Sequence, residues 1–260
     1  MPEFSGMELP RPWKIERVPC SGSHWLQVLR AGPAQGPGLL VLHGAAGCWH
    51  NFRRQIDWLQ HRYRIVAPDL RGHGVSPWPG ASSVDDFTDD VLQVVEHTLP
   101  GPFAILAHSF GGCMAVKTAY RLGNRVRGLA LISTAGNIPL TPAMAALKVV
   151  GGLSHWVARL DSYWLSCHGS VARSLLWHTL PGWNTWPLMS ELHVPTCVVA
   201  GRFDSLVPWK LSQRMADLLP QASFKCLPRG RHVPMWEHEA ELQQELEVWL
   251  GRLSWTNGGP

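Results

Sequence analysis

The sequence predicts an α/β fold with a mostly parallel central sheet, helices on both faces of that sheet and an inserted helical segment. Short apolar runs, bounded by Gly, Pro or polar residues, recur along the 260-residue chain and lack the polar alternation of half-exposed strands. Segments with helical spacing of apolar residues separate these runs. The composition, 45% hydrophobic and 16% charged, provides the apolar side chains for a large core, so we expect one folded domain.

The strands are predicted in chain order. Residues 13–18 and 24–29 alternate partially between apolar and polar side chains, which predicts an antiparallel hairpin at one edge of the sheet. The later runs have no such alternation and are expected to be strands buried on both faces. These runs are residues 38–44, 63–69, 103–109, 128–134, 196–201 and 223–227.

Helices are expected between and after these strands, because apolar residues recur there at intervals of three and four. The spaced sets are Phe52, Ile56 and Leu59; Val84, Phe87, Val91 and Val95; Leu211, Met215 and Leu218; and Leu242, Leu246, Trp249 and Leu253. Ser83 and Asp86 have the spacing of a capping box at the start of the second of these helices. Gly123 is placed to end the helix that begins after Ser109.

The alternation of strands and helices stops between residues 137 and 193. No clear strand is visible in that segment, and it contains five tryptophans among helical patterns. We therefore expect a helical lid at 137–193, an α/β core made of 13–136 and 194–255, and flexible tails at 1–12 and 256–260. Three of the lid tryptophans, Trp156, Trp164 and Trp177, are candidates for lining an apolar substrate pocket, the alternative being that they pack the lid against the core.

Composition limits the classes of partner. The net charge of +4 comes from scattered lysines and arginines, so we expect no nucleic-acid partner. The six cysteines lie far apart without metal-ligand spacing, and there is no phosphate loop, so neither a metal nor a cofactor is expected. No secretory signal and no apolar run near the ~18 residues of a membrane span are visible, which favours a cytoplasmic protein with a small-molecule substrate. The sequence indicates no oligomeric state.

The strongest motif is the run from Ala107 to Gly112, AHSFGG, which follows an apolar strand and precedes a helical pattern. A sharp strand-to-helix turn exposes its central serine above the sheet, and this turn needs small residues two positions before and two after that serine. Ala107 and Gly111 occupy those positions, although glycine is more usual at the first. Ser109 is therefore the candidate nucleophile, with a helix-capping serine as the alternative. The neighbouring His108 is a candidate substrate-pocket residue, the alternative being that it only packs within the turn.

A serine hydroxyl needs a base to take its proton and a third group to orient that base. His232 lies on a loop beyond the last predicted strand, and Asp204 lies on the loop after the strand at 196–201. Loops at the carboxyl ends of parallel strands converge on one site, so we expect both side chains near Ser109. Taken singly, Asp204 could be a helix cap and His232 a structural loop histidine. Their order along the chain favours a Ser-His-Asp triad.

Five motifs together resemble the α/β-hydrolase superfamily, in its serine-nucleophile branch, from about residue 38 to residue 250. They are the HGAAG run from His43, the DLRGHGVS run from Asp69, the Ser109 turn and the two loops that carry Asp204 and His232. The resemblance implies an oxyanion hole formed by the backbone N–H groups of Ala45 and Phe110. It also implies that His43 and His73 shape loops rather than react.

The activity implied by this resemblance is that of a carboxylesterase-like hydrolase, which cleaves an apolar ester or related acyl substrate through an acyl-enzyme without a cofactor. Carbon-carbon bond hydrolases, thioesterases, cofactor-free perhydrolases and lyases use a similar triad and remain alternatives. Members with an aspartate nucleophile are disfavoured by Ser109. A ligand sensor with slow hydrolysis is the alternative from another functional class. The fold alone does not indicate the substrate.

Overall fold

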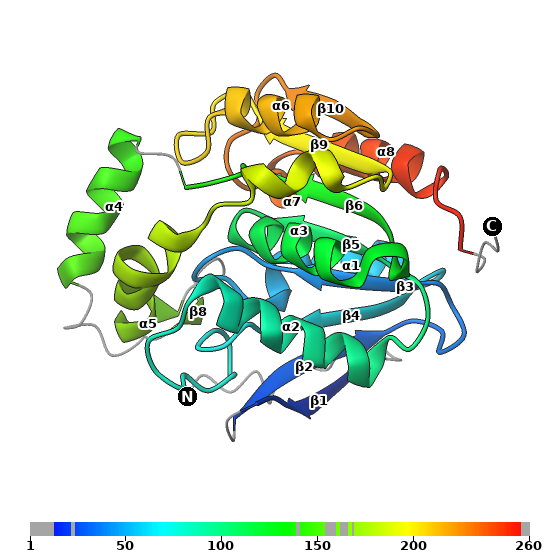
Figure 1. The fold of residues 1–260 in the computed structure, drawn as a ribbon, viewed down its shortest axis with the longest axis horizontal. Helices are drawn as coiled ribbons and strands as arrows, with labels where there is room; N and C mark the ends of the chain where they lie inside the picture. Colours follow the sequence, from blue (N-terminus) through cyan, green and yellow to red (C-terminus); the bar gives the residue numbers. More distant parts are fainter. Residues whose placement is uncertain are drawn as a thin grey trace.

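A twisted eight-stranded sheet forms the centre of the computed structural model, with helices on both sides (Figure 1). The structure describes residues 13–21, 24–138, 141–153, 160–161, 166–167 and 169–255. The order of strands across the sheet is β1-β2-β4-β3-β5-β6-β9-β10. Their bounds are β1 Lys14–Pro19, β2 Trp25–Ala31, β3 Gly38–Leu42, β4 Arg64–Pro68, β5 Phe103–His108, β6 Val126–Ile132, β9 Thr196–Gly201 and β10 Ala222–Leu227.

Pairing between the strands confirms the predicted fold class. Strands β1 and β2 form the expected antiparallel edge hairpin, and β2 pairs antiparallel with β4. From β4 to β10 every neighbouring pair is parallel. Parallel strands end at the same edge of the sheet, so the loops after β3, β5, β9 and β10 lie together.

Helices divide between the two faces of the sheet. Their bounds are α1 Arg53–Leu59, α2 Val84–Thr98, α3 Phe110–Leu122, α4 Pro142–Leu153, α5 Gly169–Ser174, α6 Trp209–Leu218, α7 Pro234–Glu237 and α8 Glu239–Leu250. Buried side chains of α2, α3 and α6 share one apolar cluster with one face of the sheet. Those of α1 and α8 share a second cluster with the opposite face. Burying both faces explains why the central strands are apolar throughout.

Local signals at the helix ends behave as the sequence predicts. The Ser83 side chain accepts a hydrogen bond from the Asp86 N–H while the Asp86 side chain accepts from the Ser83 N–H, which completes the capping box of α2. Gly123 follows the last residue of α3 with a φ of +50°. The buried face of α6 differs from the prediction, because Leu218 is 40% exposed and Ser212, Met215 and Ala216 face the core instead.

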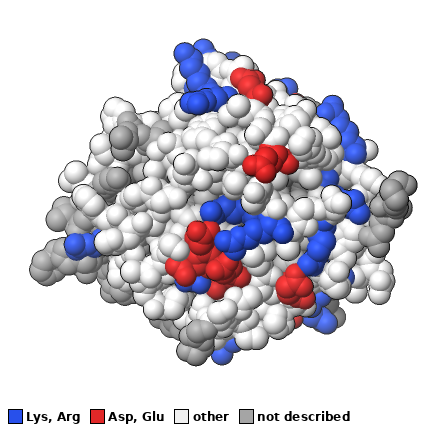
Figure 2. Space-filling view, viewed as in Figure 1, with Lys and Arg blue, Asp and Glu red and all other residues white. Residues whose placement is uncertain are grey.

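Ion pairs join α2 to α3 on the surface. Asp85 lies 3.0 Å from the Lys117 amine and 3.1 Å from the Arg121 guanidinium, which also pairs with Asp89. Figure 2 shows these opposite charges side by side in the middle of the face drawn. Exposed pairs of this kind contribute little individually, roughly 0 to 1 kcal/mol each.

The segment 137–193 contains more than helices. Besides α4 and α5 it has two short strands, β7 Leu160–Asp161 and β8 Ser166–Cys167, which pair antiparallel and which the sequence pattern did not reveal. A π-helical turn at Leu175–Thr179 continues α5, and 3-10 turns follow at Leu180–Gly182 and Trp186–Glu191. Trp156, Trp164 and both expected tails lie outside the described residues.

Tryptophans of this segment pack against the core where the structure describes them. Trp183 is almost fully buried, and its ring centroid lies 6.0 Å from that of Phe110. The Trp186 ring lies over Gly136, where a Cβ atom would come within 2.2 Å of it. Trp177 is 50% exposed. Over the described residues, no helix has both the length and the apolar character that crossing a membrane requires.

Candidate active site

Ser109 lies on the sharp turn between β5 and α3. Its backbone has φ 49° and ψ −119°, a left-handed conformation that costs on the order of 1–3 kcal/mol in a residue with a side chain. Gly111 makes the turn possible, because a Cβ atom there would lie 2.5 Å from the Leu42 carbonyl oxygen. Although Ser109 precedes the first residue of α3, its side chain makes no capping hydrogen bond. Its hydroxyl is instead available to the side chains above the sheet.

Alanine takes the place of the more usual glycine at the start of this turn. Ala107 is fully buried in β5, where it is aligned with Leu42 of β3 and Leu131 of β6. The regular register on both sides shows that the sheet accommodates the extra methyl group.

Side chains from three separate loops form one hydrogen-bonded line. The Ser109 Oγ lies 3.1 Å from the His232 Nε2, and the His232 Nδ1 lies 2.7 Å from the Asp204 Oδ2. In this arrangement one nitrogen of the imidazole can accept the hydroxyl proton while the other donates to the carboxylate. The residues that the sequence grouped as a triad therefore lie within hydrogen-bonding distance of one another.

The Asp204 side chain is held by its own loop. It has no exposed surface, and its Oδ1 accepts the N–H groups of Leu206 and Val207, each at 2.9 Å. Oδ2 remains for His232. Hydrogen bonds to both oxygens fix the orientation of the carboxyl group. Asp204 thus combines the capping role considered from the sequence with contact to the imidazole.

Direct backbone contacts join the loop of Asp204 to the loop of His232. The Phe203 N–H donates to the Gly230 carbonyl at 2.8 Å. Gly201, the last residue of β9, allows this approach, because a Cβ atom there would lie 2.1 Å from the carbonyl oxygen of the residue before His232. The role of Gly201 was not predicted from the sequence, and a glycine at the end of a buried strand, three residues before Asp204, was the available signal.

His108 lies beneath the loop of His232. Its ring is buried, and its Nε2 donates to the His232 carbonyl at 2.8 Å. Burial, followed by the nearby imidazole of His232, lowers the pKa of His108 to about 3. The ring is therefore neutral near neutral pH, with its proton on the Nε2 that donates this hydrogen bond. His108 is therefore placed to position His232, and the pocket-lining role considered from the sequence stays a prediction.

Replacing His108 tests this positioning role. His108→Leu removes the donor to the His232 carbonyl, and a displacement of the base by ~1 Å lowers rates by about 10²-fold. We expect kcat to fall by about 10- to 100-fold with little change in KM. His108→Gln places an amide nitrogen near the original Nε2 and should recover part of kcat. Equal losses in the two variants would contradict a role that depends on the hydrogen bond.

The two expected oxyanion-hole residues lie on the loops beside Ser109. Phe110 is the first residue of α3, so its N–H has no partner within the helix. Ala45 follows β3, and its neighbour Ala46 has a φ of +60°. The Ala46 N–H donates to the His73 Nε2 at 2.9 Å. Within the described part of the chain, no hydrogen bond is found from the N–H of Ala45 or Phe110.

Buried side chains hold the loop after β3 in place. The His43 Nε2 accepts the Leu70 N–H at 2.9 Å, and its Nδ1 lies 2.8 Å from the Gly44 carbonyl. Asp69, which was not singled out from the sequence, accepts the Trp49 N–H at 2.9 Å. These contacts support the loop-shaping role expected for His43. The hydrogen bond from the Ala46 N–H to the His73 ring supports the same role for His73.

Buried neutral histidines should make the protein less stable in acid. Burial lowers the pKa of His73 to about 4 and that of His43 well below its usual value, as it does for His108. The unfolded chain takes up protons at these positions below about pH 6.5 and the folded chain does not, so stability present above that pH is lost as pH falls towards 4. We expect each histidine to lower the unfolding free energy by roughly 1 kcal/mol per pH unit in this window.

Urea unfolding at pH 7.5, 6 and 5 measures this effect. His73→Gln has one ionisable group fewer, so its unfolding free energy should fall less steeply with acidification than that of the unchanged protein. The two proteins are compared by the slope of the unfolding free energy against pH, because the substitution also changes stability at neutral pH. Parallel pH dependences of the two proteins would show that His73 does not contribute.

Known proteins resemble this chain over most of its length. The protein-family model for the alpha/beta hydrolase fold matches residues 37–168, which is just over half of the chain. A magnesium-chelatase 30 kDa subunit from Rhodobacter capsulatus is 28% identical over 239 residues, covering 78% of this chain and 83% of that protein. A pimeloyl-(acyl-carrier protein) methyl ester esterase from Aliivibrio fischeri is 23% identical over 249 residues, covering 84% of this chain and 95% of that protein.

Solved structures agree with the observed fold. An esterase from Rhodococcus sp. ECU1013 has a TM-score of 0.80 at 21% identity, covering 92% of this chain and 99% of the other. An enol-lactonase from Burkholderia xenovorans LB400 has a TM-score of 0.79 at 19% identity, covering 91% and 100%. At these identities the likeness concerns the fold alone. Together with the match to the family model, the sheet order and the turn at Ser109 show that this chain belongs to the α/β hydrolase fold family.

Proposed function

We propose that the protein is a serine hydrolase that cleaves an ester or related acyl substrate through an acyl-enzyme intermediate. The observation that carries this proposal is the line from the Ser109 Oγ through His232 to the Asp204 carboxylate, with contacts of 3.1 Å and 2.7 Å. The fold and the esterases among its relatives support the same reaction class.

In the proposed mechanism, the His232 Nε2 takes the Ser109 proton as the hydroxyl oxygen attacks the acyl carbon. The N–H groups of Ala45 and Phe110 stabilise the oxyanion that forms, and Asp204 stabilises the imidazolium. His232 then protonates the leaving group, and the acyl group remains on Ser109. A water molecule, deprotonated by the same imidazole, attacks the acyl-enzyme and releases the acid.

The segment 137–193 is proposed to act as a lid over this site. It packs on the nucleophile turn through the contact of Trp183 with Phe110, the residue after Ser109. A segment that touches the turn so closely is placed to shape the acyl pocket, and Trp177, which is 50% exposed, offers apolar surface elsewhere on the same segment. An apolar acyl group is therefore the expected substrate class.

Covalent labelling followed by turnover assays tests the proposal. A fluorophosphonate should label one residue, and peptide mapping should identify it as Ser109. Hydrolysis is then measured across nitrophenyl esters of increasing acyl length, the corresponding thioesters, and lactones. Efficient turnover of esters supports the proposal, and much faster turnover of thioesters indicates a thioesterase. Labelling with negligible turnover of every compound indicates the ligand sensor and contradicts a hydrolytic role.

A further inference from the structure

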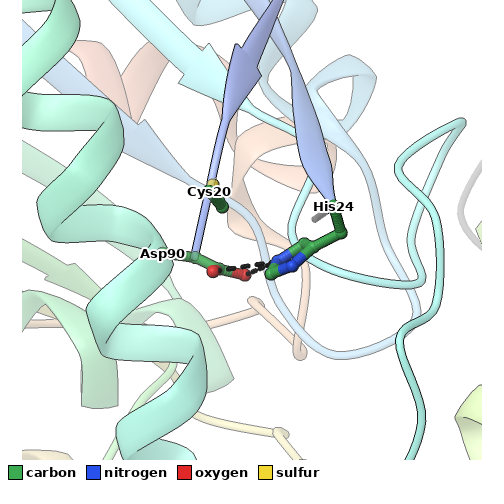
Figure 3. Close-up of side chains that lie close together, drawn as sticks. All are labelled: Cys20, His24 and Asp90. Carbon is green, nitrogen blue, oxygen red and sulfur yellow. Dashed lines mark hydrogen bonds and ion pairs between the residues drawn. The ribbon is translucent and has the colours of Figure 1, made fainter. Parts of the chain in front are cut away.

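A buried group of three potential metal ligands lies away from the nucleophile turn, where the first hairpin meets α2. Cys20 follows β1 and His24 precedes β2, so the two residues flank the hairpin turn, while Asp90 comes from the middle of α2 (Figure 3). The Cys20 Sγ, a ring nitrogen of His24 and a carboxylate oxygen of Asp90 all lie within 4.8 Å of one another. The side chains of His24 and Asp90 are only 8% and 1% exposed.

We propose that Cys20, His24 and Asp90 form a binding site for a divalent transition-metal ion, with Zn²⁺ as the best match. Thiolate, imidazole and carboxylate are the three ligand types that Zn²⁺ takes in proteins. Ligand atoms around a tetrahedral zinc ion lie ~3.5 Å apart, given metal–ligand distances of roughly 2.0–2.3 Å. The His24 Nε2 lies 3.0 Å from both Asp90 oxygens, so an ion would replace this hydrogen bond and the two side chains would separate by about 0.5 Å to reach that spacing.

Arg71 supports the carboxylate from the other side. Its Nε donates to the Asp90 Oδ2 at 2.7 Å, and its own position is fixed by a 3.0 Å hydrogen bond to the Ser82 Oγ. Oδ1 does not contact Arg71, and its partner is the His24 Nε2, the atom that the ion would take over. Carboxylate ligands in metal sites are commonly held by such an outer hydrogen bond, which orients the ligating oxygen.

A surface cavity is lined by two of the three ligands, His24 and Asp90. Its volume is about 220 Å³, and it is lined by Ser21, His24, Arg71, Pro79, Asp86, Asp89, Asp90 and Gln93. Three carboxylates on this wall, those of Asp86, Asp89 and Asp90, meet two guanidinium groups, that of Arg71 and that of Arg121, which pairs with Asp89, so the local charge still favours a cation. The cavity also leaves room for a water molecule as the fourth ligand, which gives three protein ligands and one open position.

An ion at this position would fasten the edge hairpin to α2. In chain order Asp90 lies 66 residues from His24, so the ion would close a long loop between two elements. Because it closes this loop, the ion is expected to act on stability, independently of the proposed hydrolysis. The same helix also carries Phe87, whose ring centroid lies 5.2 Å from that of Phe110 beside the nucleophile.

Cobalt and zinc titrations of the full chain test the site. The protein is first treated with a chelator and then titrated with Co²⁺, whose bond to a thiolate gives a charge-transfer band in the near ultraviolet. We expect about one Co²⁺ per chain with this band, its displacement by Zn²⁺, and a rise in Tm of several degrees with excess Zn²⁺. Absence of the band and of any Zn²⁺-dependent change in Tm would overturn the proposal.

Matched substitutions locate the binding. Cys20→Ser should remove the charge-transfer band, and His24→Gln should weaken binding by at least about 10-fold. The controls are Cys226→Ser, a partly buried cysteine in β10, and His97→Gln, an exposed histidine on α2, and both should bind as the unchanged protein does. If Cys20→Ser does not fold, His24→Gln and its His97 control decide the question. A band retained in full by the Cys20 or His24 variant would show that the ion binds elsewhere.

Discussion

Replacing Ser109 by alanine should lower the turnover of an activated ester, such as a nitrophenyl acylate, by about 10⁴- to 10⁶-fold. The variant lacks the oxygen that attacks the acyl carbon, so His232 and Asp204 have no nucleophile to activate. Only the oxyanion donors and substrate binding remain to accelerate attack by water. The measurement is kcat/KM for the ester, together with loss of fluorophosphonate labelling.

The backbone at this turn allows a control for folding. Alanine has a Cβ atom and keeps the cost of the left-handed φ of +49°, whereas glycine relieves it. Ser109→Gly should therefore be as inactive as Ser109→Ala and at least as stable, so that lost activity is not confused with unfolding. Ser223→Ala, in β10, is the matched serine control and should keep full activity. Substantial turnover by both Ser109 variants would end the assignment of the nucleophile.

Local sequence signals were sufficient for most of the fold. The buried strands are apolar because helices cover both faces of the sheet, and the capping box at Ser83 acts within four residues of chain. The nucleophile turn is equally local as a signal, because the six consecutive residues from Ala107 to Gly112 are enough to recognise it. Features of this kind depend on neighbours in sequence and can be predicted from them.

Contacts between distant residues could not be predicted in this way. The hydrogen bond of His108 to the His232 carbonyl joins positions 124 residues apart, and no pattern near His108 distinguishes it from a pocket residue. The two-residue strands β7 and β8 are too short for alternation to be visible. The group of Cys20, His24 and Asp90 was missed for a related reason, since its third member comes from a helix far along the chain.

Asp204→Asn should lower kcat by about 10⁴-fold while leaving the site almost unchanged in shape. The asparagine oxygen can still accept the N–H groups of Leu206 and Val207, so its amide nitrogen turns towards His232. That nitrogen donates, and the His232 Nδ1 must then accept. The imidazole proton moves to Nε2, the atom that faces Ser109, and the ring can no longer take the hydroxyl proton.

Two variants separate the effect of the imidazole tautomer on kcat from the effect of the loop geometry. Asp204→Ala should also lose the two backbone contacts of the loop, so it should be less stable than Asp204→Asn as well as inactive. Asp217→Asn, an exposed position on α6, controls for the loss of a negative charge and should change neither stability nor kcat. Near-normal kcat in Asp204→Asn would mean that the carboxylate does not set the state of the imidazole. The line of hydrogen bonds would then be a structural feature of the loops and not the proton path.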